Sequence, residues 1–250
     1  MCPPLHYEPA RDEDASSVMT EWRSLYRLLR DELDVQVDLL EPRPDMPRLV
    51  LAASGGFVWK DSFIPSRPRD VSRRSEGEAW TNFFMVRGYA VRELPHGGCF
   101  DGERDLVMAA GTLFAGYRSD GDRAAHQVLS EILQHEVHSL RLSDQWEWPL
   151  DTCLFPLGGD MAVWHPEAFR PDARKVLEYK LPGLQSMDAG EATRLVCNAL
   201  VAEGQVILPE GCGASAARLE QEGFQVHALP LESYARHGAG PKALALKIED

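Results

Sequence analysis

Asp105-Leu-Val-Met-Ala-Ala-Gly-Thr-Leu-Phe-Ala-Gly-Tyr117 is the stretch that decides the fold. Two apolar runs flank the small residues Ala109-Ala-Gly111, a pattern typical of two strands joined by a tight turn. Helical spacing over residues 122–134 and another apolar run over residues 136–142 follow. The sequence therefore predicts a ββαβ unit, in which a hairpin comes first and a crossover helix leads to a third strand.

The same order of elements recurs along the chain. Hairpin patterns begin at Leu49, Thr152 and Leu195. Helical patterns follow them over residues 76–87, 172–179 and 214–222. The period is roughly 45–50 residues, which is typical of a repeat architecture. Four such units account for most of the chain.

The two ends of the chain are incomplete units that complement each other. A helix from Ser16 to about Glu32 and a strand over Val35–Leu39 have no hairpin before them, and the last strand, Ala243–Ile248, has no helix after it. Joining them gives a fifth unit and closes a ring, which removes exposed sheet edges. The predicted fold is a single α/β domain over residues 1–250, a five-bladed pseudo-symmetric α/β propeller of ββαβ units with a ligand site at its centre.

Composition argues against several classes of partner. With a net charge of −13 and a pI of about 5.1, the chain is too acidic for nucleic acid to be a main partner. The five cysteines are well separated and no Cys/His cluster has zinc spacing, so we expect free thiols, no metal and no cofactor. The N-terminus lacks a signal-peptide pattern and no apolar run reaches roughly 18 residues, which predicts a cytoplasmic protein without a membrane partner. A homodimer is left open.

Short motifs in all parts of the chain carry a resemblance to a known family. They are Met1-Cys-Pro-Pro4, Pro44-Asp-Met46, Gly56-Phe-Val58, Phe100-Asp-Gly102 followed by Asp105, Leu150-Asp-Thr-Cys153 and Cys197-Asn-Ala199. In this order they resemble the pentein superfamily, which includes arginine deiminases, dimethylarginine dimethylaminohydrolases and amidinotransferases. The nearest likeness is to the bacterial arginine dihydrolase group. The resemblance covers nearly the whole chain and implies the same five-bladed α/β propeller.

The chemistry that the resemblance implies is carried only in part by this sequence. Members of the family attack a guanidinium carbon with a cysteine thiolate, transfer protons with a histidine and hold the guanidinium with carboxylates. The histidine position is Pro149 here and the cysteine position is Ala243. The carboxylates match Asp105 and Asp151, and an arginine of the family motif matches Arg118.

Further departures affect the implied site. Arg104 stands in place of a glycine, Ser54 in place of an asparagine, and residues 8–15 in place of an Ile-Asn-Pro-Trp-Met segment. Cys99 is the one thiol left that we place in a loop facing the centre, although an incidental thiol is the commoner role for such a residue. The sequence therefore predicts that the chain is not a covalent arginine deiminase, dihydrolase or amidinotransferase.

The candidate site residues follow from these motifs and from the ring geometry. We assign catalytic acid/base roles to Asp105, Asp151, His237 and Glu147, and ligand-binding roles to Asp61, Arg118, Glu103, Ser54, Asn198 and Trp148. Two acids that meet in a partly dry channel require a cation, which favours a ligand over an ion-pair relic. Structural alternatives stay open: solvated loop charges for the two glutamates, and packing for the histidine and the tryptophan.

Two hypotheses of function remain. In the first, the protein is a repurposed enzyme that acts on an arginine-like or amino-acid-derived small molecule without a covalent intermediate. In the second, it is a catalytically dead homologue that binds such a ligand, or a partner protein, for regulation. The retained acids favour the first. An open pocket lined by Asp105, Asp151 and Arg118 would support a ligand, and a channel filled by Trp146, Trp148 or Arg104 would support a scaffold.

Overall fold

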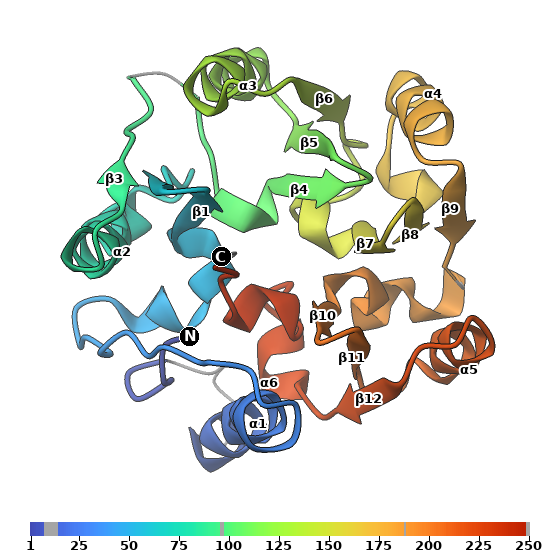
Figure 1. Cartoon of the computed structure of the whole chain (residues 1–250), viewed down its shortest axis with the longest axis horizontal. Helices are drawn as coiled ribbons and strands as arrows, with labels where there is room; N and C mark the ends of the chain where they lie inside the picture. The colour runs from blue at the N-terminus through green and yellow to red at the C-terminus, as the bar shows by residue number, and fades with distance from the viewer. Residues whose placement is uncertain (8–14, 96–97, 188, 249–250) are drawn as a thin grey trace.

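The computed structural model describes residues 1–7, 15–95, 98–187 and 189–248. Over these residues the chain forms four three-stranded sheets, one from each predicted repeat (Figure 1). In each sheet the first two strands form an antiparallel hairpin. The third strand pairs in parallel with the second, after a crossover helix. The predicted α/β fold of ββαβ units is confirmed in these four copies.

Each unit contains its hairpin, its helix and its returning strand in the predicted order. The elements are β1 (Gly56–Trp59), β2 (Ser62–Pro65), α2 (Glu76–Val86) and β3 (Ala90–Val91); β4 (Leu106–Ala109), β5 (Thr112–Tyr117), α3 (Asp120–Leu133) and β6 (Val137–Arg141); β7 (Leu154–Gly158), β8 (Met161–Trp164), α4 (Pro171–Lys180) and β9 (Gly183–Ser186); β10 (Leu200–Ala202), β11 (Gln205–Pro209), α5 (Gly213–Gln221) and β12 (Val226–Leu229).

Local chemistry explains the boundaries of the second unit. Ala110 and Gly111 have φ of 49° and 70°, so a two-residue turn with left-handed backbone joins β4 to β5. Helix α3 begins with a capping box, in which the Asp122 backbone N–H donates to Ser119 Oγ at 3.3 Å and the Ser119 N–H donates to Asp122 Oδ2 at 3.1 Å. The helix ends at Leu133, because the next residue, Gln134, has a left-handed backbone with φ of 48°.

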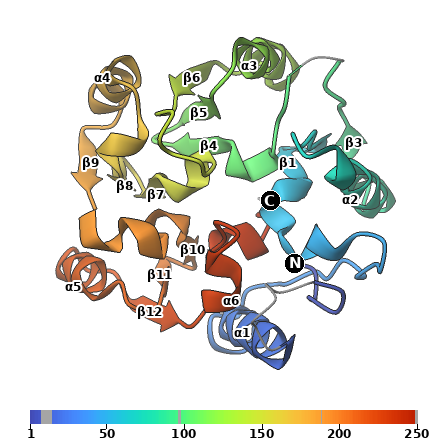
Figure 2. The same ribbon diagram turned by 180° about the vertical axis from the view of Figure 1, so that it is seen from behind.

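The sheets are arranged around a common centre. Figures 1 and 2 show helices α1 to α5 on the periphery and the first strand of each sheet, β1, β4, β7 and β10, on the inner side. The loops that precede these inner strands therefore converge, and they carry most of the candidate site residues. None of the described helices combines the length and the apolar character needed to cross a membrane.

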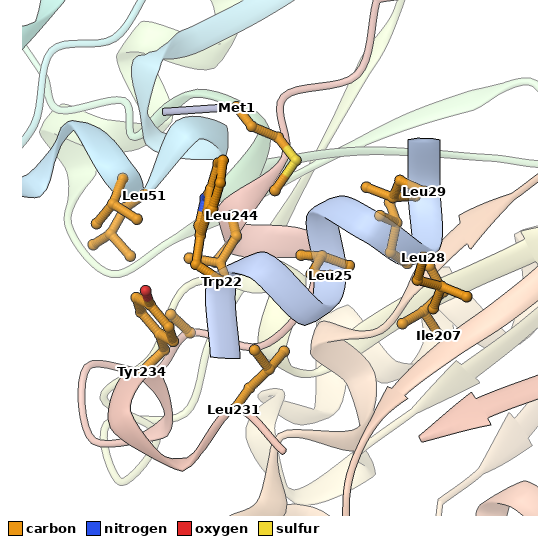
Figure 3. Close-up of a cluster of buried hydrophobic side chains, with 14 of the residues drawn as sticks. Met1, Trp22, Leu25, Leu28, Leu29, Leu51, Ile207, Leu231, Tyr234 and Leu244 are labelled. Atoms are coloured by element: carbon orange, nitrogen blue, oxygen red, sulfur yellow. The ribbon is translucent and has the colours of Figure 1, made fainter. Parts of the chain in front are cut away.

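The fifth sector joins the two ends of the chain through packing. Helix α1 (Ala15–Arg27), extended by a π-helical turn to Glu32, packs against the segment that contains α6 (Glu232–Ala235). Figure 3 shows Trp22 and Leu25 of α1 beside Tyr234 and Leu244. Burial of this apolar surface holds the N-terminal helix against the C-terminal segment.

The strands predicted over residues 35–39 and 243–248 are not formed. The first segment has no strand pairing, and a 3-10 helix over Lys242–Leu244 takes up the start of the second. Residues 35–39 alternate like a strand, but no neighbouring strand pairs with them in the described sheets. The five-bladed closed propeller thus stays a prediction, with four sheets among the described residues.

Candidate functional site

A cavity of about 180 Å³ lies beside the 3-10 helix Gly102–Arg104, and residues of the first and second repeats make up most of its wall. Asp105, Asp101, Arg73, Arg118 and Pro149 are among the residues that line it. The cavity is strongly polar, with carboxylates and guanidinium groups in its wall. It contains two of the three residues, Asp105 and Arg118, that the sequence predicts in an open pocket.

Gly102 positions the acids of this cavity. Its φ is 64°, and a Cβ atom there would lie 2.6 Å from the Ala53 carbonyl oxygen, so only glycine fits between the two segments. The short helix that follows lets the Asp101 backbone N–H donate to Asp105 Oδ2 at 2.8 Å. The two carboxylates are therefore held close together.

Asp105 is a carboxyl group poised between two protonation states. Burial, and next the charge of Asp101, raise its pKa from 3.8 to about 7, and Arg118 opposes the shift. Asp101 forms an ion pair with Arg73, whose Nη1 lies 3.6 Å from Asp101 Oδ1. Ser54, which is buried, donates its hydroxyl to Asp101 Oδ2 at 3.2 Å. Among the described residues no ion pair is made by Asp105 itself.

Arg118 lies at the exposed end of β5 and ties the next loop to the cavity. Its Nε and Nη2 donate to the Trp146 carbonyl oxygen at 3.3 Å and 3.0 Å, and Nη2 also donates to the Trp148 carbonyl oxygen. These acceptors are neutral, so the positive charge of Arg118 remains available to an anion in the cavity.

Asp151 is turned away from this cavity and is paired with Arg104. Both side chains are almost fully buried, and Arg104 Nε donates to Asp151 Oδ2 at 3.2 Å. Arg104 Nη2 donates to the Gly238 carbonyl oxygen. Burial raises the pKa of Asp151, and Arg104 and Lys242 oppose that shift. Trp146, Trp148 and Arg104 were the side chains expected to fill a closed channel. Of these, Arg104 contacts one of the two acids that match the family motifs, Asp151.

Asn198 links this ion pair to the C-terminal segment. Its Nδ2 donates to Asp151 Oδ2 at 2.7 Å and to the Asp151 carbonyl oxygen at 3.3 Å. Its Oδ1 accepts the backbone N–H groups of Gly240 at 2.7 Å and Ala243 at 3.1 Å. Ala243, the position at which the resemblance implies a nucleophile, is fully buried in this network.

A second, mainly apolar cavity of about 160 Å³ lies along the inner strands β1, β4, β7 and β10. Asp151, Glu103 and Lys242 supply polar groups to its wall. Glu103 forms an ion pair with Lys242 and accepts the Lys247 backbone N–H at 3.1 Å. Glu103 therefore anchors the C-terminal segment instead of facing the first cavity.

The remaining predicted site residues lie outside both cavities. Asp61 is exposed in the β1–β2 turn, and Glu147 is exposed in the loop before Pro149. His237 meets the Tyr7 ring edge-on, with centroids 5.6 Å apart. The Trp148 ring packs against Gly238, where a Cβ atom would lie 2.1 Å from the ring. Residues 8–14, which include most of the departure near the N-terminus, lie outside the described chain.

Four of the five thiols are buried and are not placed for nucleophilic chemistry. Burial raises the pKa of Cys153 and Cys197 well above the usual range, and that of Cys2 and Cys212 to about 12. None of these thiols is hydrogen-bonded to an imidazole in the part of the chain that the structure covers. Cys99, half-buried, lines the first cavity. Over the described residues, no three His, Cys, Asp or Glu side chains are grouped so that they could hold a metal ion.

Sequence reasoning missed three residues of this region. Asp101 lies inside the Phe100-Asp-Gly102 motif, and its proximity to Asp105 was signalled only by their spacing. Arg73 belongs to the densest basic stretch of the chain, but nothing local places it beside Asp101. Lys242 gave no signal, because its partner Glu103 is 139 residues away.

Sequence comparison finds relatives that modify guanidino groups. No family model matches the chain. It is 29% identical over its full length to the bifunctional arginine dihydrolase/ornithine cyclodeaminase AgrE of Nostoc sp., and spans 37% of that protein. It is 28% identical to the dimethylarginine dimethylaminohydrolase of Mycobacterium tuberculosis, over 94% of this chain and 77% of the relative.

Solved structures of two relatives superpose on almost the entire chain. The N-terminal domain of ArgZ, an arginine dihydrolase from the ornithine–ammonia cycle in cyanobacteria, matches with a TM-score of 0.92 and 28% identity, covering 98% of this chain and 95% of that domain. The same domain has been solved covalently bound to a reaction intermediate. AgrE with ornithine and NAD+ matches with a TM-score of 0.91 and 30% identity, over 98% of this chain and 38% of AgrE. The chain is thus a homologue of the arginine dihydrolases and of dimethylarginine dimethylaminohydrolase, with the α/β fold of the pentein superfamily.

Proposed function

We propose that this protein binds a small zwitterionic, amino-acid-type molecule without forming a covalent bond to it. The observation that carries the proposal is the first cavity, in which the acid pair Asp101 and Asp105 and the guanidinium of Arg118 line the same space. An ammonium group beside Asp105 would relieve the repulsion between the two acids, and a carboxylate beside Arg118 would use its charge. Both ends of an amino acid would thus find a partner.

Several features argue against the covalent chemistry implied by the resemblance. Pro149 has no proton to transfer, and Ala243 has no nucleophilic atom. The buried thiols have raised pKa values, so they stay protonated at neutral pH. Asp151 is paired with Arg104 and does not line the first cavity. These features favour a binding or regulatory role. The retained acids alone, considered in the sequence, had favoured a repurposed enzyme.

The proposal is tested by calorimetric titration of the full chain with ornithine, lysine, citrulline, arginine and agmatine. We expect saturable binding of an amino acid, and weak binding of agmatine because it lacks a carboxylate. With the pKa of Asp105 at about 7, the affinity for an ammonium group should fall roughly tenfold from pH 8 to pH 6, as Asp105 becomes protonated.

A matched pair of variants locates the site. Arg118→Gln should weaken amino-acid binding by roughly tenfold or more, since it removes a charge-assisted contact. Arg123→Gln, on the exposed face of α3, should leave binding unchanged. Equal binding by the two variants, or no binding by any of the five compounds, would refute the proposal.

One observation favours the repurposed enzyme as a second candidate. A carboxyl group with a pKa near 7 is suited to general acid/base catalysis at neutral pH, and Asp105 has such a value. Mass analysis of the same ligands after prolonged incubation separates the candidates. Product formation that is lost in Asp105→Asn would establish the enzyme, and recovery of unchanged ligand would support the binding protein.

A further inference from the structure

We infer that the Arg104 side chain occupies a guanidinium-binding site of this protein from within, and that the ligand of the first cavity therefore lacks a guanidinium group. The statement about the ligand rests on the proposed function. The occupation of the site by Arg104 is independent of it, because it follows from the contacts of the buried side chains.

Two buried acceptors contact the guanidinium of Arg104. Asp151 Oδ2 lies 3.2 Å from Nε, and the Gly238 carbonyl oxygen accepts from Nη2. Asp151 Oδ1 is buried and has no hydrogen-bond partner among the described residues. A guanidinium offers five N–H donors in one plane, so a group free to reposition could satisfy both carboxylate oxygens as well as the carbonyl.

These acceptors are held in place by groups other than Arg104. Asn198 Nδ2 donates to Asp151 Oδ2 at 2.7 Å and to its backbone carbonyl at 3.3 Å. The Gly238 N–H donates to the Ala235 carbonyl oxygen at 2.9 Å, and the Trp148 ring packs against Gly238. The carboxylate and the carbonyl should therefore keep their positions when the Arg104 side chain is shortened.

The site adjoins the first cavity. Arg104 directly precedes Asp105, which lines that cavity, and Pro149, two residues before Asp151, lines it too. The charge of Asp151 contributes to the raised pKa of Asp105, so the two carboxylates are electrostatically close. We expect removal of the Arg104 side chain to open space beside Asp151, which already lines the second cavity. In the native protein the Arg104 guanidinium takes the contact with Asp151 that a guanidinium ligand would need.

Arg104→Ala tests the inference by making room for an external guanidinium. Titration calorimetry with methylguanidine and with arginine should show affinities at least roughly tenfold higher for Arg104→Ala than for the native chain, because a buried carboxylate regains a charge-assisted partner. Citrulline, which has the shape of arginine without the charge, should gain nothing.

Two further variants separate space from charge. Arg104→Met fills the volume with an apolar chain and should bind methylguanidine no better than the native protein. Arg104→Ala combined with Asp151→Asn opens the volume but removes the carboxylate, and it should lose the gained affinity. The inference is overturned if folded Arg104→Ala shows no gain, or if the native chain already binds arginine as tightly as Arg104→Ala.

Folding of the variant provides a second readout. If Arg104→Ala is unfolded alone, methylguanidine at millimolar concentration must restore its cooperative melting transition and urea at the same concentration must not; failure of this rescue overturns the inference as well. Binding of methylguanidine by Arg104→Ala, with no amino acid bound by the native chain, would uphold the occupation of the site by Arg104 while refuting the proposed function.

Discussion

Replacing Asp105 by asparagine should stabilise the protein, although a hydrogen-bonded side chain is altered. The pKa of this carboxyl is raised from 3.8 to about 7, mainly by burial. An acid with a raised pKa in the folded state ionises first in the unfolded chain, so stability is lost as pH rises from about 4 to about 7. The full shift corresponds to about 4 kcal/mol at about 1.4 kcal/mol per pKa unit, and we halve it because the Asp105 side chain is partly exposed.

Urea unfolding at two pH values measures this effect. Asp105→Asn should raise the free energy of unfolding by about 2 kcal/mol at pH 8 and by less than about 1 kcal/mol at pH 5, where the native carboxyl is protonated. Asp160→Asn, at an exposed turn, should change it by less than about 0.5 kcal/mol at either pH. Destabilisation by Asp105→Asn at pH 8, or an effect independent of pH, would refute the account of Asp105.

Three further predictions concern the surrounding network. Asn198→Ala should destabilise the chain by about 3 kcal/mol in urea unfolding, because it leaves the buried groups bonded to Asn198 without hydrogen-bond partners. Asn82→Ala, on the exposed face of α2, should cost less than about 0.5 kcal/mol. A small loss of stability in Asn198→Ala would contradict the hydrogen-bond network. Iodoacetamide should alkylate Cys99 in the native protein and leave Cys153 unmodified, as peptide mass mapping would report; early alkylation of Cys153 would count against its burial. Burial lowers the pKa of His126 to about 4, so the stability that its neutral imidazole contributes is present above pH 6.5 and is lost as pH falls. His126→Gln should therefore reduce the loss of unfolding free energy between pH 7 and pH 5 by about 2 kcal/mol in urea unfolding. An unchanged pH profile would argue against a buried neutral imidazole.

The repeat was predictable because local patterns determine it. The helix expected over residues 122–134 is found over Asp120–Leu133, and that over residues 76–87 is Glu76–Val86. Hairpins and amphipathic helices have their own hydrophobic periods, which a single sequence displays. The two strands predicted for the fifth unit were wrong, because residues 35–39 and 243–248 alternate like strands but have no neighbouring strand with which to pair.

Motifs in the sequence pointed to some residues of the two cavities but to none of their pairings. Asp105, Asp151 and Arg118 were all found from motifs, as was the unusual Arg104. That Arg104 meets Asp151, 47 residues away, depends on how two loops converge at the centre of the ring. His237 and Glu147 were chosen for their chemistry, and the ring places one beside Tyr7 and the other at the surface. Long-range contacts of this kind have no signature in local spacing.

The carboxyl carbon of Asp105, followed by NMR as a function of pH, tests the central claim most directly. In the ligand-free protein it should titrate near 7. With a bound amino acid, the neighbouring ammonium group should lower that pKa by about one unit or more. Titration of Asp105 near pH 4 in the ligand-free protein would contradict the claim that this acid is positioned to bind the ammonium group of a ligand. A titration midpoint that no zwitterionic ligand shifts would contradict it as well.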